Sequence, residues 1–217
     1  VDLVVTSEMA LTGYPPKDLL LYGNFVRQIQ KGLNKLAKKT TSLPPLLVGT
    51  VPINNSIHGK PLYNSCAFLY QGKIKQLFHK SLLPTYDVFD EDRYFEPVSK
   101  PQILKIGRQE IGISICEDMW NDPDFNHQHR YHSDPIALLN QKGVNLIINL
   151  SASPFYIGKQ QLREKMISGL SYKYRLPIAY VNQVGGNDEL IFDGRSCIFN
   201  PDGKLISLAK SFTEDIL

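Results

Sequence analysis

The sequence predicts an α/β fold in which sheets and helices form separate layers, and two observations lead to this prediction. Short apolar runs rich in β-branched residues recur along the 217 residues, and most lack the polar alternation of a strand with one face in water. Amphipathic helical stretches separate some of these runs, whereas tight turns join others. Strands linked both by helices and by hairpins are typical of layered α/β proteins.

The apolar runs have the length and composition of strands that are covered on both faces. Each is short, and helical stretches, turns or polar segments separate it from the next. The expected strands are Asp2–Thr6, Leu46–Pro52, Ser65–Tyr70, Gln109–Ile115, Leu146–Asn149, Ile178–Asn182 and Cys197–Asn200.

Three stretches show helical periodicity. Asn24–Lys38 places apolar residues on one face and lysines on the other, which is typical of a helix lying on a core. Asp134–Lys142 is predicted as a short helix that Gly143 ends. Gln160–Tyr174 is predicted as a longer helix, which Pro177 prevents from continuing.

Turn residues predict two hairpins and a further turn. Tyr63–Gln76 turns at Gln71–Gly72, and Arg195–Leu208 turns at Pro201–Gly203. The segment Gly185–Asp188 lacks the spacing of a phosphate-binding loop. We therefore expect it to form a turn near a pocket rim and not a nucleotide cradle.

Composition argues against several classes of partner and site. The formal net charge is only +3, and no apolar run is long enough to cross a bilayer, so neither a nucleic-acid nor a membrane partner is expected. The three cysteines, Cys66, Cys116 and Cys197, are far apart and lack CxxC spacing, which argues against a disulfide framework or a zinc site. A reducing, cytoplasmic setting is favoured.

Three residues that could take part in catalysis each follow a β-rich run: Glu8, Lys80 and Cys116. A partly desolvated carboxylate can act as a general base, and a lysine held in a pocket can stabilise an oxyanion. A cysteine at a strand end is a possible nucleophile, and a nearby ammonium would favour its thiolate. Taken singly, each has a plainer interpretation, namely a loop charge, a solvated lysine and a small buried apolar residue.

In the order Glu, Lys, Cys, these residues resemble the catalytic triad of the nitrilase, or carbon–nitrogen hydrolase, superfamily. A finer resemblance covers essentially the whole chain and is to the glutaminase domain of the glutamine-dependent NAD synthetase family. It implies that residues 1–217 form one glutaminase domain with an αββα sandwich fold, in which helices flank two sheets. The similar blocks are SEMALTGYPPKDLL, HKSLLPTYDVFDEDRYFEP, ICEDMW, NLSASPFYIGK and YVNQVGGNDELIFDGRSCIFNPDGKL.

This resemblance implies hydrolysis of the side-chain amide of glutamine through a thioester on Cys116, with Glu8 as base and Lys80 at the oxyanion. The ammonia would reach a synthetase domain in cis, which makes NAD from nicotinic acid adenine dinucleotide. ATP and magnesium are expected only in that domain, since these 217 residues contain no SGGxDS-type loop. The glutaminase step itself needs no metal or other cofactor. Members of the superfamily usually pair, so a homo-oligomer is expected.

The resemblance also implies a substrate pocket. Tyr86 and Phe89 match positions that line the glutamine pocket, and Ser153 and Lys159 match positions that bind the amino-acid end. A related enzyme has arginine in place of Lys159, and a lysine keeps the charge but lacks the bidentate fork.

Two acidic residues are implied as supports of the pocket. Glu91 resembles a second glutamate that positions the lysine and the attacking water. Glu117, which directly follows Cys116, is expected to orient the turn.

A group of histidines allows two interpretations. His127, His129 and His132 lie close together in sequence, with Asp124 and Asp134 nearby. They could form a metal site, but the spacing lacks a HExxH pattern and the segment is polar. A solvated surface loop is therefore favoured, and no metal is expected.

Two other functions stay open at this stage. One is a stand-alone carbon–nitrogen hydrolase, similar to an ω-amidase, that acts on a small amide. The other is a catalytically silent scaffold, against which the presence of Glu8, Lys80 and Cys116 together argues. Because the chain opens directly in a strand, we expect a piece of a longer protein that lacks its first strand–helix unit and its C-terminal synthetase domain. An unpaired sheet edge predicts low glutaminase activity for this piece alone.

Overall fold

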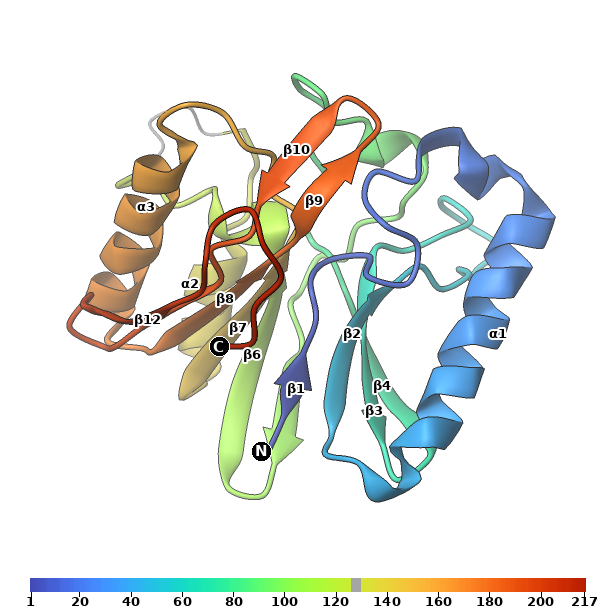
Figure 1. Ribbon diagram of the computed structural model, residues 1–217, viewed down its shortest axis with the longest axis horizontal. Helices are drawn as coiled ribbons and strands as arrows, with labels where there is room; N and C mark the ends of the chain where they lie inside the picture. The colour runs from blue at the N-terminus through green and yellow to red at the C-terminus, as the bar shows by residue number, and fades with distance from the viewer. Residues whose placement is uncertain (126–129) are drawn as a thin grey trace.

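The computed structural model describes residues 1–125 and 130–217. Its elements form successive layers of helix, sheet, sheet and helix, as Figure 1 shows from α1 on one side to α2 and α3 on the other. The αββα sandwich predicted from the resemblance is therefore confirmed.

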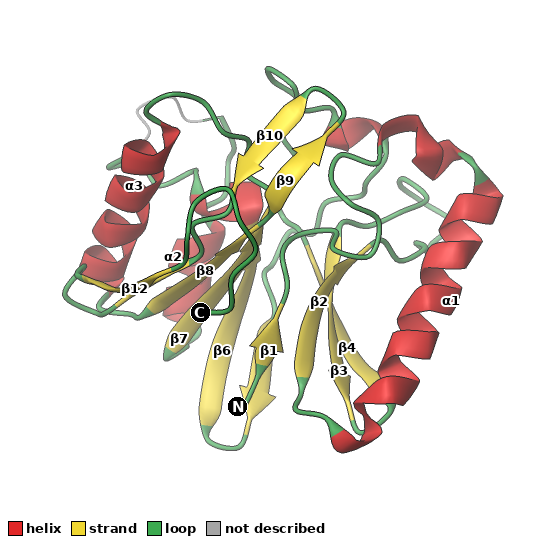
Figure 2. Ribbon diagram, in the orientation of Figure 1, coloured by secondary structure: helices red, strands yellow, loops and turns green. Residues whose placement is uncertain are grey.

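One sheet has the strand order β1-β2-β3-β4. Its members are β1 (Val4–Val5), β2 (Leu46–Thr50), β3 (Ser65–Tyr70) and β4 (Lys73–His79). Strand β1 runs parallel to β2, and the remaining pairs are antiparallel. Helix α1 (Gly23–Lys39) covers the outer face of this sheet (Figure 2).

Helix α1 forms because its apolar residues recur every three or four positions. The residues that it buries are Val26, Ile29, Leu33 and Ala37, which is the spacing of one helical face. Lys38 and Lys39 lie in the last turn, where their positive charges interact favourably with the negative end of the helix dipole and stabilise the helix.

The second sheet has the order β12-β11-β8-β7-β6-β5, with β6, β7 and β8 parallel to one another. Helices α2 (Pro135–Gln141) and α3 (Lys159–Tyr174) cover its outer face. A separate hairpin, β9 (Val184–Asn187) and β10 (Leu190–Asp193), lies across one end of the molecule (Figure 1). The strands of this sheet are β5 (Ile103–Ile106), β6 (Gln109–Ile115), β7 (Leu146–Ser151), β8 (Ile178–Asn182), β11 (Cys197–Phe199) and β12 (Leu205–Leu208). Short 3₁₀ helices span Lys17–Leu21, Thr40–Ser42, Glu91–Arg93 and Cys116–Met119.

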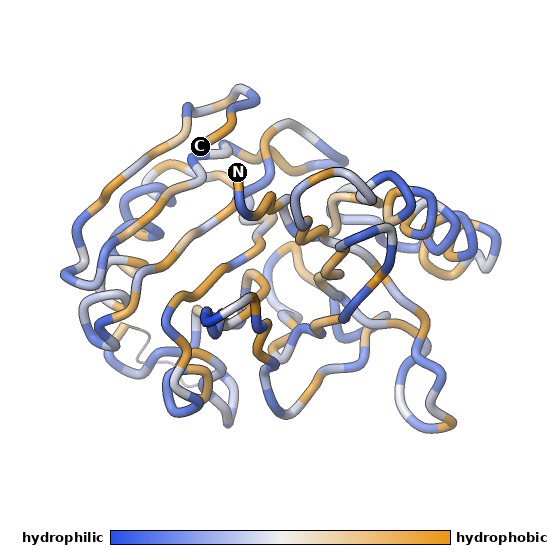
Figure 3. The backbone as a smooth tube through the Cα atoms, turned by 90° about the horizontal axis from the view of Figure 1, so that it is seen from below, coloured by the Kyte–Doolittle hydropathy of each residue, from blue (hydrophilic) through white to orange (hydrophobic). Residues whose placement is uncertain are grey.

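The two sheets pack face to face through a continuous apolar core. Leu47 and Phe68 from the first sheet contact a group that includes Ile113 and Ile148 from the second. Figure 3 shows the strands as largely orange, whereas α1 alternates between orange and blue. Each fully buried side chain of this kind stabilises the fold by roughly 1.5–3 kcal/mol, so the contact between the sheets fixes their relative position.

The strands and helices predicted from the sequence are present, with differences at their ends. The first strand is shorter than Asp2–Thr6, because only Val4 and Val5 are in register with β2. The segment Gly185–Asp188 is not a turn as a whole: its first three residues belong to β9, and the turn begins at Asp188. Both predicted hairpins form, as β3–β4 and β11–β12.

Strand β5 was not predicted, because its four residues carry no clear pattern and it forms only by pairing with β6. Within residues 1–125 and 130–217, no helix has both the length and the apolar character needed to cross a membrane.

Candidate active site

The site lies where strands of both sheets end. Glu8 follows β1, Lys80 follows β4, and Cys116 follows β6. Figure 2 shows these strands running toward the same end of the molecule, below the β9–β10 hairpin. The three side chains are almost completely buried, with 1%, 0% and 6% exposed. Two sheets that end at one place thus bring together residues that are remote in sequence.

The ammonium group of Lys80 lies between two carboxylates. Its Nζ is 2.8 Å from Oε1 of Glu8 and 2.8 and 2.9 Å from the two oxygens of Glu91. Burial alone would lower the pKa of Lys80, but the two carboxylates raise it well above its ordinary value. Lys80 is therefore a permanent cation at this position.

Glu8 is held by donors from both sheets. Its Oε1 accepts hydrogen bonds from Lys80 and, at 2.7 Å, from the side-chain amide of Asn64. Its Oε2 accepts from the backbone N–H of Ala152, at the end of β7, at 2.9 Å. The backbone around Glu8 can pass close to Gly49 only because Gly49 has no side chain, since a Cβ there would lie 2.3 Å from the backbone nitrogen of Met9. The carboxylate consequently has one fixed orientation.

Glu91 joins the same cluster from the opposite side. It accepts a hydrogen bond of 2.8 Å from the hydroxyl of Tyr14 and one of 3.2 Å from Asn64. Burial raises the pKa of Glu91 to about 7, Lys80 opposes this effect, and the nearby Glu8 carboxylate adds to it. One lysine therefore faces two acids, and the second acid is easily protonated.

Cys116 begins the 3₁₀ helix after β6 with a φ of 41°, in the left-handed region that a residue with a side chain rarely adopts. Burial and the charge of Glu8 raise the pKa of this thiol well above its ordinary value, and Lys80 opposes them. As expected, the ammonium of Lys80 favours the thiolate, but its effect on the pKa is smaller than the combined effects that oppose it. Desolvation and the surrounding carboxylates outweigh one lysine, so a base must remove the proton.

Cys116 opens onto a pocket of about 260 Å³. Five of the six predicted substrate-pocket residues line it, whereas the sixth, Glu91, does not and instead contacts Lys80. The lining residues are Tyr86, Asp87, Val88, Phe89, Cys116, Glu117, Trp120, Ser153, Pro154, Phe155, Tyr156, Lys159 and Leu190.

The pocket lining includes an acid, Glu117, and a basic residue, Lys159, among aromatic side chains. Glu117 accepts hydrogen bonds from the hydroxyl groups of Tyr86, at 2.8 and 2.9 Å, and Tyr131, at 3.0 Å. Burial raises the pKa of Glu117, and these two hydroxyl groups counteract the rise. The ammonium of Lys159 lies over the ring of Trp120, 4.1 Å from its centroid, and burial lowers its pKa.

Ser153 is placed by its backbone. Its N–H donates to Oδ1 of Asn182 at 2.9 Å, which joins the end of β7 to the end of β8. The Asn182 amide in turn donates to the carbonyl of Gly194 at 2.9 Å. The segment that follows β7 is thereby fixed along the pocket wall.

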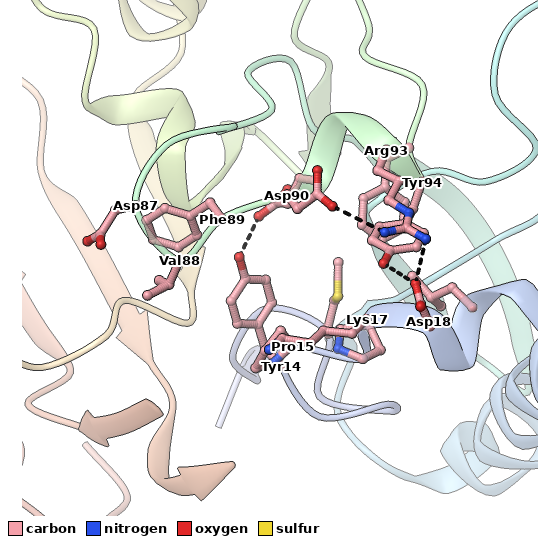
Figure 4. A pocket seen from close by; sticks show the side chains of 15 residues that line it. Tyr14, Pro15, Lys17, Asp18, Asp87, Val88, Phe89, Asp90, Arg93 and Tyr94 are labelled. Atoms are coloured by element: carbon pink, nitrogen blue, oxygen red, sulfur yellow. Dashed lines mark hydrogen bonds and ion pairs between the residues drawn. The ribbon is translucent and has the colours of Figure 1, made fainter. Parts of the chain in front are cut away.

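A second cavity, of about 440 Å³, adjoins the pocket and shares Asp87, Val88 and Phe89 with it. Figure 4 shows the ring of Tyr14 in this cavity with its hydroxyl group turned toward a carboxylate, which is that of Glu91. Tyr14 and Glu91 both line this cavity, so the cluster around Lys80 borders it, whereas Cys116 lines the smaller pocket.

Sequence reasoning missed several residues that support the site. Asn64 contacts Glu8, and Tyr14 contacts Glu91. Asp118 accepts hydrogen bonds from the segment that follows Lys80 and from the residue that precedes Cys116. Tyr14 and Asp118 lie in motifs already singled out, so their proximity to Glu8 and Cys116 was an available signal. Asn64 carries no signal beyond being polar directly before an apolar strand.

The predicted histidine group is only partly visible. His127 and His129 lie outside the described residues, and His132 is exposed. Asp124 forms an ion pair with Lys173, and Asp134 caps α2. Within the described residues, no group of three or more His, Cys, Asp or Glu side chains is placed to hold a metal ion.

Comparison with known proteins identifies the family. A model of the carbon–nitrogen hydrolase family matches residues 1–217.

The chain belongs to the carbon–nitrogen hydrolase family.

Among curated members, the glutamine-dependent NAD(+) synthetase of Synechocystis sp. is 50% identical over 218 residues, which cover 99% of this chain and 39% of that protein. The glutamine-dependent NAD(+) synthetase of Thermotoga maritima is 40% identical, over 100% of this chain and 35% of that protein. This carbon–nitrogen hydrolase chain thus spans less than two fifths of the length of these relatives.

Solved structures agree with the assignment. The glutamine-dependent NAD+ synthetase of Acinetobacter baumannii, in complex with ADP, is 35% identical with a TM-score of 0.87, over 99% of this chain and 38% of that one. An amidase of the nitrilase superfamily from Nesterenkonia is 17% identical with a TM-score of 0.77, over 97% of this chain and 74% of that one. At that identity the second match supports the carbon–nitrogen hydrolase fold alone.

Proposed function

We propose that this chain hydrolyses the side-chain amide of glutamine and supplies the ammonia to a synthetase domain in the same protein. The observation that carries the proposal is one cysteine that opens onto a small pocket and is flanked by a fixed carboxylate and a permanent cation. The names of the relatives support glutamine as the substrate and NAD synthesis as the destination of the ammonia.

Glutamine fits the charges of the pocket. Its ammonium group would face the carboxylate of Glu117, and its carboxylate would face the ammonium of Lys159. Tyr86 and Phe89 would contact the methylene groups between them, with Ser153 at the amino-acid end. A pocket of about 260 Å³ suits a small amino acid better than a peptide.

In the first half of the reaction, Glu8 takes the proton of the Cys116 thiol as the sulfur attacks the amide carbon. The raised pKa of the thiol makes this base necessary. The ammonium of Lys80 and the backbone N–H of Glu117 stabilise the oxyanion of the tetrahedral intermediate. Glu8 then returns the proton to the nitrogen, the carbon–nitrogen bond breaks, and ammonia leaves a γ-glutamyl thioester on Cys116.

In the second half, Glu8 takes a proton from water, which attacks the thioester carbon. The carbon–sulfur bond breaks, the sulfur regains its proton, and glutamate leaves. Glu91 positions Lys80 throughout, since it contacts the ammonium with both oxygens. Glutamine hydrolysis as a whole needs no metal or cofactor in this proposal. ATP and magnesium belong to the synthetase step, outside these 217 residues.

The native protein is proposed to be longer than this chain, cytoplasmic and self-associating. A reducing compartment keeps Cys116 as a thiol. The additional parts would be a first strand–helix unit and a C-terminal ATP-dependent synthetase domain. Light scattering on the native protein measures its mass and its number of subunits together.

The test is selective alkylation of the three thiols. Iodoacetamide should label Cys116, and glutamate or a non-hydrolysable glutamine analogue should prevent the labelling. Cys66 and Cys197 are internal controls, because burial raises the pKa of both and neither lines the pocket. Cys116→Ala should stop ammonia release, whereas Cys66→Ala and Cys197→Ala should retain it.

Substrate choice separates this proposal from a stand-alone amidase. Ammonia release from glutamine should exceed release from simple aliphatic amides by at least about tenfold, because only glutamine can contact both Glu117 and Lys159 through charged groups. Faster turnover of a small neutral amide would favour the stand-alone amidase instead. Labelling that glutamine analogues do not affect would contradict both enzyme functions.

A further inference from the structure

Asp118 lies two residues after Cys116, is 3% exposed, and does not line the substrate pocket. Its carboxylate accepts hydrogen bonds from three backbone N–H groups. Oδ1 accepts from Ser81 at 3.0 Å and from Leu82 at 2.8 Å, and Oδ2 accepts from Ile115 at 2.9 Å. A buried carboxylate with three such donors is an oriented part of the structure and not a solvated loop charge.

The three donors come from two separate segments. Ser81 and Leu82 directly follow Lys80, whereas Ile115 directly precedes Cys116. The first segment leaves β4 of one sheet, and the second leaves β6 of the other. A single side chain therefore ties the start of the cysteine turn to the segment that carries the lysine.

The cysteine turn needs such support. Cys116 has a φ of 41°, and a residue with a side chain holds this conformation only where its surroundings impose it. The bond from Ile115 to Asp118 closes the turn around Cys116. The bonds from Ser81 and Leu82 fix the closed turn against the other sheet. Burial raises the pKa of Asp118 to about 6, and the backbone donors and Lys80 counteract the rise, so the carboxylate is ionised at neutral pH.

We propose that Asp118 is a positioning residue that keeps the sulfur of Cys116 and the ammonium of Lys80 in a fixed relation to each other, where one strand of each sheet ends. The inference deepens the proposed function, since it assumes that these two groups act together on one amide. Asp118 touches neither the pocket nor the substrate, and its effect passes entirely through the backbone of its neighbours.

The test compares Asp118→Asn and Asp118→Ala with Asp134→Ala. Asp134 is the control, because its carboxylate also accepts hydrogen bonds from backbone N–H groups, in this case the two of Ile136 and Ala137, both at 3.0 Å. Asp118→Asn is nearly isosteric and keeps an oxygen for Ser81 and Leu82, so it should fold even if the alanine variant does not. Circular dichroism and the melting temperature measure the folded fraction of each variant.

Asp118→Asn should lower kcat per folded molecule by about tenfold or more, with KM changed by less than about threefold, since a displacement near 1 Å can reduce a rate by about a hundredfold. Asp134→Ala should lower the melting temperature but leave kcat per folded molecule unchanged. A purely structural role predicts the same result for both aspartates. If the kcat of Asp118→Asn equals that of the wild type or of Asp134→Ala, the proposal fails.

A second measurement does not depend on the substrate. Iodoacetamide should alkylate Cys116 of Asp118→Asn at least about tenfold more slowly than the wild-type thiol, because the sulfur is no longer aligned with the base. An unchanged or faster rate overturns the positioning role. If the wild type does not hydrolyse glutamine but the alkylation rate still falls in Asp118→Asn, the proposed substrate is wrong and the positioning role stands.

Discussion

Lys80 and Arg163 are both almost completely buried cations, with 0% and 2% of the residue exposed, but their surroundings differ. Lys80 contacts two carboxylates, those of Glu8 and Glu91, within 2.9 Å. Arg163 contacts one, since its Nη2 is 2.6 Å from Oδ2 of Asp193. The first cluster therefore has an excess of acid, whereas the second is balanced.

The excess acid has chemical consequences. Burial is the largest cause of the raised pKa values of the Cys116 thiol and of Glu91, and the excess acid adds to both rises. The excess acid also supplies a carboxylate that can take a proton. The balanced pair instead joins α3 to the end of β10, with the guanidinium 5.7 Å from the ring of Tyr180. Within the described part of the chain, Nη1 of Arg163 has no hydrogen-bond partner. Burial of charge is thus common to both clusters, and only an acid excess beside a nucleophile indicates catalysis.

The largest expected effect separates the clusters by activity. Lys80→Met should lower kcat/KM for the amide by about a thousandfold, since it removes an oxyanion donor and leaves Glu8 without its counter-ion. Arg163→Met should keep kcat per folded molecule within about threefold of the wild type, because Arg163 does not line the pocket. Ammonia release, normalised to the folded fraction, measures both. Equal losses in the two variants would erase the distinction between the clusters.

The next effect separates them by stability. Arg163→Met should lower the free energy of unfolding by about 3–5 kcal/mol, because it leaves Asp193 buried without its partner. The double variant Arg163→Met, Asp193→Leu should regain most of this loss, since apolar residues of similar volume can replace a buried ion pair. Urea denaturation measures the three free energies. A double variant no more stable than Arg163→Met would contradict the view that the pair is only structural.

The smallest effect concerns pH. The folded-state pKa of Glu91, about 7, lies above its ordinary value of 4.5. Its protonation therefore stabilises the fold fully below about 4.5, and this contribution is lost as the pH rises through about 7. Glu91→Gln should accordingly show a smaller fall in unfolding free energy between these pH values than the wild type. Thermal denaturation across this range measures the difference.

The control for the pH effect is the Arg163→Met, Asp193→Leu variant. It should keep the wild-type pH dependence between pH 4.5 and 7, because the second cluster contributes no excess acid. A wild type and a Glu91→Gln variant with equal pH dependence would mean that Glu91 is not the group that titrates.

The candidate site was predictable to the extent that its residues follow recognisable strands. Glu8, Lys80 and Cys116 each follow a β-rich run, and strand ends are where sheets can converge. Asn64 was not predictable, because it contacts Glu8 across 56 positions and no local pattern reports such a pair. The net pKa of the cysteine was not predictable for the same reason, since it depends on burial and on the balance of charges from distant segments.

Periodicity over a few residues determined the strands, the helices and the two hairpins, because apolar spacing and turn residues act locally on the backbone. The amino-acid sequence also determined which side chains were available for catalysis. Only the tertiary structure decided that one lysine would face two acids, and that Asp118 would bond Ser81, which lies 37 positions away. Such contacts depend on how two sheets pack, and the electrostatics of a buried site depend on those contacts.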